Sequence, residues 1–110
     1  MTESKEPLEK VFCFDCDGVI CFTKGTDYAK SKPNYGVIKK INSLYDLGHT
    51  IKVFTGRGSQ SGLDWRATTE FQLKEWGVKY HELIMGKPSY DFFIDDHAWN
   101  IKDWLNEKIP

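Results

Sequence analysis

The sequence predicts one α/β domain in which a parallel sheet carries helices on both faces. Its 110 residues are close to the commonest domain size and leave room for a single hydrophobic core. Short apolar runs alternate along the chain with stretches of helical periodicity. This alternation is typical of parallel sheets that are covered by helices on both sides. We therefore expect residues 1–110 to form one domain, with residues 1–9 as a loose polar lead-in.

The first predicted strand runs from Lys10 to Cys16 and contains the apolar run Val11–Phe14. An apolar run of this length that leads into a glycine-containing loop is typical of a buried strand. Residues 18–32 have no clean periodicity, so we expect a loop or a small hairpin over the end of that strand.

The middle of the chain predicts a helix followed by a second strand. Pro33 and Asn34 open the helix, and Gly48 follows its last apolar residue, as at many helix ends. Its apolar residues recur mostly at steps of three and four: Val37, Ile38, Ile41, Leu44, Tyr45 and Leu47. The next strand covers residues 51–55 and ends at the loop of residues 56–59.

The last third of the chain predicts two more strands and two more helices. A helix over residues 63–76 is stopped by Gly77, and a short strand follows over residues 80–84. Residues 91–94 form another apolar run, which we interpret as a fourth strand. The apolar residues between Ala98 and Leu105 have the spacing of a final amphipathic helix.

Acidic and hydroxyl side chains follow the ends of these strands. Asp15 and Asp17 lie at or just after the end of the first, Thr55 ends the second, and Asp95 and Asp96 directly follow the fourth. The carboxyl ends of parallel strands meet at one edge of a sheet, where such sheets bind ligands. Neighbouring carboxylates can be held together by a hard cation, by a shared proton or by water. Because Mg²⁺ prefers carboxylate oxygens, the sequence predicts a magnesium site at this edge.

Other groups predicted for the same edge suit a phosphate. The Thr55 hydroxyl is followed closely by Gly56 and Gly58, and glycine-flanked N–H groups bind phosphate oxygens. Lys87 would offset the negative charge of a phosphoryl group. Arg57 either clamps a phosphate or carboxylate of the substrate or is an ordinary surface arginine. Together these residue types indicate phosphoryl transfer.

Four short motifs occur in order between residues 14 and 96: FDCDGVI, VFTGRG, GKP and FFIDD. In their order and their position on the predicted strands, they resemble the motifs of the haloacid dehalogenase (HAD) superfamily. The resemblance implies a Rossmann-like, three-layer fold and the activity of a small phosphatase. Dehalogenases of the superfamily lack the acid–base aspartate that Asp17 would supply, which favours the phosphatase.

The resemblance also implies a role for each motif residue. Asp15 would be the nucleophile that forms an aspartyl-phosphate, and Asp17 the general acid and then the base for water. The phosphoryl group would be bound by Thr55, Gly56, Arg57 and Lys87. The Mg²⁺ ion would be held by Asp15, the carbonyl group of Asp17, Asp95 and Asp96.

Larger members of the superfamily carry a cap domain after the first motif or between the second and third. The corresponding gaps here, residues 18–51 and 56–87, leave no room for one once their helix and strand are subtracted. Capless members act on large substrates or cover the site by forming homo-oligomers. We expect a phosphomonoesterase of a small metabolite, such as a sugar phosphate of polysaccharide biosynthesis.

Two other functions remain open at this point. A receiver-like signalling domain also uses acidic residues, a threonine and a lysine. Receivers, however, place the aspartate pair early and the phosphorylated aspartate later, the reverse of the order here. A catalytically inactive domain that binds a phosphorylated ligand would keep the same residues. Whether Trp65, Arg66 or His97 contacts a substrate is open as well.

Charge and cysteine content limit the partners and the cellular compartment that we expect. The formal net charge of −1 gives no reason to expect a nucleic-acid or membrane partner. No apolar run approaches the roughly 20 residues of a membrane span. Three cysteines without a secretion signal favour free thiols in the cytoplasm. We expect Cys13 to be a buried small hydrophobe, rather than half of a Cys13-x-x-Cys16 redox or metal pair.

Overall fold

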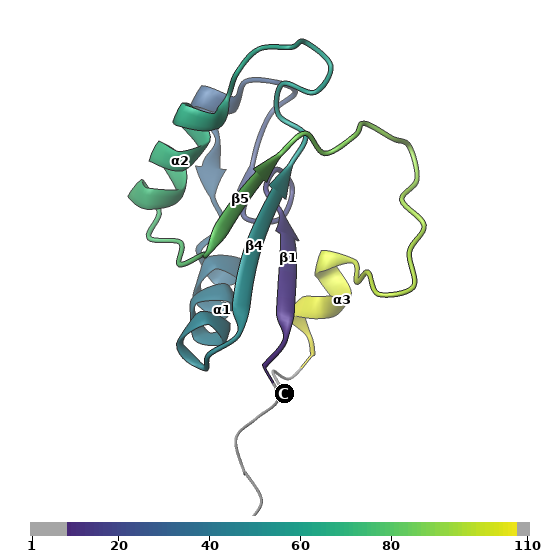
Figure 1. Ribbon diagram of the computed structural model, residues 1–110. Coiled ribbons are helices and arrows are strands. Elements are labelled where there is room, and N and C mark those ends of the chain that lie inside the picture. Colours follow the sequence, from purple (N-terminus) through teal and green to yellow (C-terminus); the bar gives the residue numbers. More distant parts are fainter. Residues whose placement is uncertain (1–8, 108–110) are drawn as a thin grey trace, which may run out of the picture.

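The structure is a computed structural model that describes residues 9–107. In chain order its elements are β1 (Val11–Asp15), β2 (Cys21–Phe22), the 3-10 helix η1 (Tyr28–Lys30), β3 (Lys32–Pro33), α1 (Tyr35–Asp46), β4 (Thr50–Thr55), α2 (Arg66–Glu75), β5 (Glu82–Met85) and α3 (Ile101–Leu105) (Figure 1). The predicted hairpin over residues 18–32 is confirmed in outline, because β2 pairs with β3 in an antiparallel ribbon. None of the helices within residues 9–107 is long and apolar enough to cross a membrane.

A parallel three-stranded sheet in the order β1-β4-β5 forms the centre of the domain. The register places Phe14 opposite Val53 and Thr55 opposite Met85. Since the strands are parallel, their carboxyl ends lie at one edge of the sheet, as predicted. Asp15 ends β1 and Thr55 ends β4 at this edge.

The hydrophobic core lies between one face of the sheet and the helices. Alternate residues of β4 are buried on this face, and they include Ile51 and Val53. The buried face of α1 supplies Val37, Ile38, Ile41 and Leu44. On α3, Trp104 packs edge to face against Phe14, with ring centroids 5.1 Å apart. Alternation in the strands and the apolar stripe of α1 therefore meet in one layer.

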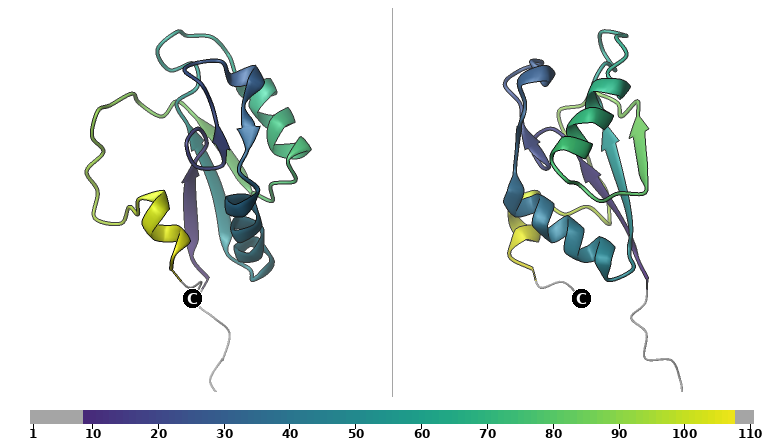
Figure 2. Two further views of the ribbon diagram at one scale, coloured as in Figure 1. Left: turned by 180° about the vertical axis from the view of Figure 1, so that it is seen from behind. Right: turned by 90° about the vertical axis from the view of Figure 1, so that its left-hand side faces the viewer.

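The expectation of helices on both faces of the sheet is wrong for the described residues. Figure 2 shows α1, α2 and α3 on the same side of the sheet. The opposite face carries Val11, which is 63% exposed, and an ion pair between Lys52 and Glu82, whose Nζ and Oε1 lie 3.7 Å apart. Within residues 9–107 no helix covers this face (Figure 2). The described domain accordingly has two layers, not three.

The predicted fourth strand at residues 91–94 is also wrong. This segment is irregular, with Phe92 86% and Ile94 93% exposed. Gly86, which has a positive φ of 92°, and Pro88 follow β5 directly. Figures 1 and 2 show the chain leaving the end of β5 in a wide loop before it returns at α3. The short apolar run Phe92–Ile94 therefore did not specify a strand here.

Helix boundaries differ by a few residues from those predicted. The second predicted helix begins at Arg66 rather than at residue 63, with Trp65 as the N-cap residue and no side-chain cap hydrogen bond from it. The Asp64 side chain, one residue earlier, accepts the Arg66 N–H at 3.0 Å. The last helix begins at Ile101, where the Asn100 side chain accepts the Lys102 N–H at 2.9 Å. A side-chain cap thus marks the start of α3.

Candidate functional site

A cavity of about 500 Å³ opens at the carboxyl-end edge of the sheet. It is lined by Asp15, Asp17, Thr26, Tyr28, Gly56, Arg57, Gly58, Gln60, Ser61, Leu63, Trp65, Lys87, Pro88, Ser89 and Tyr90. Five of the residues singled out from the sequence for catalysis or phosphate binding are among them: Asp15, Asp17, Gly56, Arg57 and Lys87. The topology therefore brings together side chains that lie up to 72 positions apart in the chain.

Asp15 and Lys87 form an ion pair in the cavity wall, with Oδ2 and Nζ 3.1 Å apart. The other carboxylate oxygen of Asp15 accepts the backbone N–H of Cys16 at 2.9 Å. Burial disfavours the charged form of Lys87, but the Tyr90 side chain and the Asp15 carboxylate outweigh it and raise the pKa of the lysine. Lys87 is therefore a fixed positive charge beside the Asp15 carboxylate.

Asp17 is held by the guanidinium group of Arg57. Nη2 of Arg57 donates to Oδ1 at 2.9 Å, and Nε donates to Oδ2 at 3.0 Å. The hydroxyl of Thr23 also donates to Oδ1. Burial alone would raise the pKa of Asp17, but these donors outweigh it and lower the pKa below its ordinary value. Asp17 is a carboxylate in this arrangement at neutral pH.

Arg57 is buried, so the alternative that it is an ordinary surface arginine is wrong. Its Nη1 donates to Oε1 of Gln72 at 2.6 Å and to Oγ1 of Thr69 at 3.1 Å, both on α2. Its Nη2 also donates to Oγ of Ser31 at 3.2 Å, and the ring of Tyr28 lies 4.9 Å from Cζ. The guanidinium group thus joins α2 and the loop before β3 to the Asp17 carboxylate. These internal partners explain its position without a substrate.

Thr55 and Gly56 occupy different positions relative to the cavity. The side chain of Thr55 is fully buried and absent from the cavity wall, and its Oγ1 accepts the Arg57 N–H at 3.2 Å. Gly56 lines the cavity, and a Cβ atom there would lie 2.9 Å from the Lys87 carbonyl oxygen. The Lys87 N–H in turn donates to the Thr55 carbonyl at 3.0 Å. The close approach requires glycine and brings Lys87 beside the end of β4.

Asp95 and Asp96 are not brought to this cavity. Both are exposed in the irregular segment between β5 and α3, and neither lines the wall. Asp96 Oδ1 lies 2.9 Å from Nδ1 of His97, and both side chains are more than four-fifths exposed. The predicted clustering depended on a fourth strand, which the described residues do not form.

Aromatic and polar side chains complete the wall, and most of them were not predicted. Trp65 and Tyr28 pack edge to face with ring centroids 5.0 Å apart, and both line the cavity. Gln60 donates to Ser89 at 3.0 Å across the rim. Nothing in the sequence spacing of Tyr28, Gln60 or Ser89 marks them as cavity residues, whereas Trp65 was a candidate substrate contact. Arg66, in contrast, lies outside this cavity and donates to the Leu83 carbonyl at 2.7 Å.

The donors at the cavity fit a hard cation in part. Mg²⁺ usually takes one or two protein carboxylates and completes its shell with water and phosphate oxygens. The Asp15 carboxylate is 38% exposed and faces the cavity, so it can serve as such a ligand. Both oxygens of Asp17 already accept hydrogen bonds from Arg57. The cavity therefore offers one carboxylate, that of Asp15, which is not paired with Arg57, although its oxygens contact Lys87 Nζ and the Cys16 N–H.

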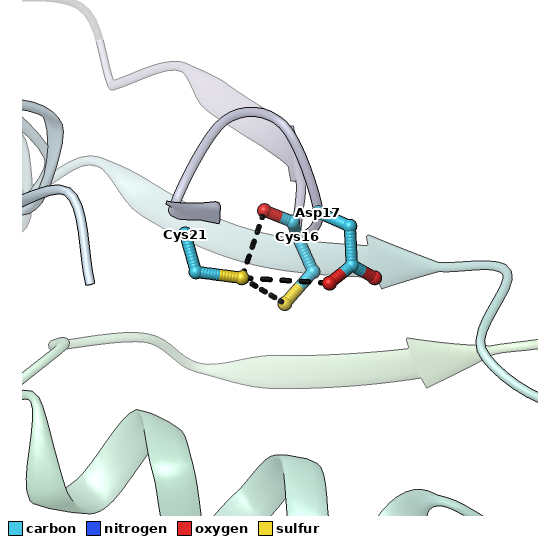
Figure 3. A group of neighbouring side chains, drawn as sticks. All are labelled: Cys16, Asp17 and Cys21. Atoms are coloured by element: carbon cyan, nitrogen blue, oxygen red, sulfur yellow. Dashed lines mark hydrogen bonds between the residues drawn. The ribbon is translucent and has the colours of Figure 1, made fainter. Parts of the chain in front are cut away.

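Within residues 9–107 one group of three possible metal ligands comes together: Cys16, Asp17 and Cys21 (Figure 3). Two of its donors are sulfur atoms, which Mg²⁺ does not favour. A cation there would also face Arg57, because Nη2 lies 3.6 Å from the Cys21 sulfur. All three cysteines are free thiols, and Cys13 is exposed, so the expectation that it is buried is wrong. The shared hydrogen bond with Cys21 and burial raise the pKa of Cys16.

No family model and no curated protein matches the chain. Its fold is similar to a crystal structure of an MCSG target from Vibrio cholerae, with a TM-score of 0.82 and 24% identity over 93% of this chain and 91% of that one. It is also similar to a chain of the Pnkp1/Rnl/Hen1 complex, with a TM-score of 0.60 and 20% identity over 94% of this chain and 36% of that one. A structure of the Pnkp1/Rnl/Hen1 RNA repair complex gives a TM-score of 0.59 and 16% identity over 94% of this chain and 34% of that one. The chain thus spans about a third of the chains that it matches in those complexes, and these likenesses show an α/β fold.

Proposed function

We propose that the protein is a Mg²⁺-dependent phosphomonoesterase of the HAD type that acts through an aspartyl-phosphate. One observation carries this proposal: the Asp15 carboxylate faces a cavity at the carboxyl ends of parallel strands, with Lys87 Nζ 3.1 Å away and Asp17 two residues on. A carboxylate nucleophile, a fixed cation and a second carboxylate are the groups that this reaction needs.

The first step would be attack of an Asp15 oxygen on phosphorus, with departure of the substrate oxygen. Lys87 would hold the carboxylate in place and offset the negative charge that the phosphoryl group brings into the cavity. The Gly56 N–H, at the cavity, would assist in binding the phosphoryl oxygens. The Arg57 side chain, whose guanidinium nitrogens donate to Asp17, Thr69 and Gln72, would instead position Asp17. Thr55, whose hydroxyl is buried against the Arg57 N–H, would support this loop from behind.

Asp17 would act as the general acid in the first step and as the general base in the second. Held by Arg57 as a carboxylate, it is ready to accept a proton from the water that hydrolyses the aspartyl-phosphate. Donation to the leaving oxygen in the first step requires the protonated form, which the Arg57 pair disfavours. We therefore expect turnover to be limited by the first step when the leaving group is a poor one.

The proposed metal would be held by the Asp15 carboxylate, together with water and phosphate oxygens. When bound, Mg²⁺ polarises the phosphoryl group and screens its charge from the nucleophile. Asp95 and Asp96 lie outside the cavity in the described conformation, so the proposal does not depend on their positions. The variants Asp95→Asn and Asp96→Asn test whether either contributes to magnesium dependence.

A small phosphorylated metabolite, such as a sugar phosphate, is the proposed substrate. The volume of about 500 Å³ suits a compound of that size, and the wall combines two aromatic rings, Tyr28 and Trp65, with the polar side chains of Gln60, Ser61 and Ser89. We propose that the enzyme works in the cytoplasm, where free thiols persist. A phosphorylated oligonucleotide also belongs among the test substrates, because two structural neighbours come from complexes named for RNA repair or its components.

The test is phosphate release from a panel of phosphomonoesters, in Mg²⁺ and in EDTA. We expect release in Mg²⁺ that EDTA abolishes and that Asp15→Asn removes. Asp103→Asn, an exposed aspartate on α3, is the matched control and should leave the rate unchanged. Absence of release from every substrate, with Mg²⁺ binding intact, would instead favour a catalytically inactive or receiver-like domain.

A further inference from the structure

Two cysteines face each other directly behind the wall of the cavity. The sulfur atoms of Cys16 and Cys21 lie 3.9 Å apart, and both residues are fully buried (Figure 3). The Cys21 N–H donates to the Cys16 carbonyl at 3.2 Å, so the two backbones are also close. Cys13 is exposed, unlike these two. The structure therefore indicates Cys16 and Cys21 as the two cysteines that can react with each other.

The sulfur of Cys21 is part of the network that holds Asp17. It donates to Oδ1 of Asp17 at 3.5 Å, and Nη2 of Arg57 lies 3.6 Å from it. The Thr23 hydroxyl is 3.7 Å away. Because Asp17 itself lines the cavity, Cys21 is one side chain behind a surface that small solutes can reach.

We propose that Cys16 and Cys21 are an oxidation site, at which hydrogen peroxide converts the two thiols to an intramolecular disulfide. The sulfur separation must fall from 3.9 Å to about 2.05 Å, and the approach of the two backbones leaves this within the reach of side-chain rotation and a small loop movement. The bond would close a loop that contains Asp17 and Gly18.

The chemistry balances in two steps. Cys21 attacks one oxygen of the peroxide and becomes a sulfenic acid, and the other oxygen leaves as water. The Cys16 thiol then attacks the Cys21 sulfur, forms the disulfide and expels the second water. Two thiols lose two electrons and two protons, and one peroxide is reduced to two molecules of water. Cys21 reacts first because its sulfur lies next to Asp17, the cavity side chain beside which the peroxide enters.

Because Cys16 and Cys21 are buried, the size of an oxidant decides whether it can reach them. Hydrogen peroxide is little larger than water and can enter beside Asp17, whose side chain is 27% exposed. Glutathione disulfide is much too large to reach a fully buried sulfur. We therefore expect peroxide to oxidise the folded protein, and glutathione disulfide to leave this pair unmodified.

The disulfide would remove the Cys21 S–H donor from Asp17 and displace the loop that carries this carboxylate. This consequence, unlike the disulfide itself, rests on the proposed phosphatase function. Displacement of a catalytic group by 1 Å costs on the order of 10²-fold in rate. We therefore expect phosphate release to fall by about that factor on oxidation and to recover on reduction with dithiothreitol.

The decisive test is mass spectrometry of the intact, folded chain after peroxide treatment. We expect a loss of about 2 Da, with one cross-linked peptide pair joining Cys16 to Cys21. Cys13→Ser should still show this loss, and Cys16→Ser and Cys21→Ser should not. Circular dichroism of each variant before treatment confirms that it is folded, and Cys16→Ala replaces Cys16→Ser if the latter is not.

A native chain that stays at its reduced mass, or that forms a bond to Cys13 or only sulfinic acid, overturns the proposal. The mass readout requires no turnover, so it decides the proposal even if the reduced chain releases no phosphate. Failure of the phosphatase function would appear separately, as absence of release from the fully reduced chain. Unchanged phosphate release by a chain that carries the Cys16–Cys21 bond overturns the regulatory consequence.

Discussion

Replacement of Arg57 by methionine removes the guanidinium group that Asp17 needs as its partner. Arg57 is 3% exposed and donates to both carboxylate oxygens of Asp17, as well as to Gln72 and Thr69. Breaking a buried ion pair by removing one partner costs about 3–5 kcal/mol. Because the Asp17 side chain is 27% exposed and can recover some hydration, we expect the lower end, about 3 kcal/mol. A domain of this kind is stable by about 5–15 kcal/mol, so the variant should still fold.

Urea denaturation at pH 7 measures this loss. With a slope of about 1–3 kcal/mol per M, a loss of about 3 kcal/mol moves the midpoint down by about 1–3 M. The control is Lys79→Met, which breaks the ion pair with Asp46 between side chains that are 48% and 60% exposed. Exposed pairs of this kind contribute at most about 1 kcal/mol. The two variants therefore compare the loss of stability when a buried ion-pair partner is removed with the loss when a surface partner is removed.

The pH dependence of the same measurement tests the cause. The folded-state pKa of Asp17 is depressed, so the stability that its ionised form contributes is present above the ordinary aspartate pKa of about 3.9. It is lost as the pH falls through the lower folded-state value. The difference between the native chain and Arg57→Met should hold from pH 7 to about pH 4 and shrink below that. A loss no larger than that of Lys79→Met, or a difference that grows on acidification, would refute the reasoning.

Three further predictions concern Lys87, Gly56 and Trp104. Lys87→Met removes the cation 3.1 Å from Asp15 and should lower kcat by about 10²–10³-fold in a phosphate-release assay; an unchanged kcat would contradict its role. Gly56→Ala puts a Cβ atom 2.9 Å from a backbone oxygen and should cost about 1–3 kcal/mol in urea denaturation, whereas Gly36→Ala, with its nearest contact at 3.6 Å in α1, should be stabilising by up to about 1 kcal/mol. Equal effects of the two would contradict the close approach. Trp104→Ala removes the buried ring that covers β1 and should cost about 3–5 kcal/mol; a thermal midpoint equal to that of the native chain would show that α3 does not pack there.

Periodicity and strand ends were enough to predict the positions of much of the domain. The apolar spacing from Val37 to Leu44 specified α1. The structure ends β4 at Thr55, as predicted, and ends β1 at Asp15, one residue before the predicted Cys16. Parallel strands put such ends at one edge, whatever the details of the loops. This is why Asp15 and Lys87 could be expected at one site although they are 72 positions apart.

The sequence could not predict what depends on tertiary packing. The pairing of Arg57 with Asp17 joins residues 40 positions apart, and no spacing rule links a loop arginine to a strand-end carboxylate. The contact between Cys16 and Cys21 depends on how the loop of β2 folds back. The apolar run at residues 91–94 matched a strand pattern, yet it lies exposed in an irregular segment. Short apolar runs do not by themselves determine pairing.

The claim that Asp15 is the nucleophile can be tested on the enzyme during turnover. The native chain is mixed with substrate and Mg²⁺, quenched in acid within the first turnover, digested and analysed by mass spectrometry. The account predicts a phosphoryl group on the peptide that contains Asp15, absent in EDTA and absent from Asp15→Asn. Magnesium-dependent phosphate release by Asp15→Asn, with no phosphoryl group on that peptide of the native chain, would contradict it.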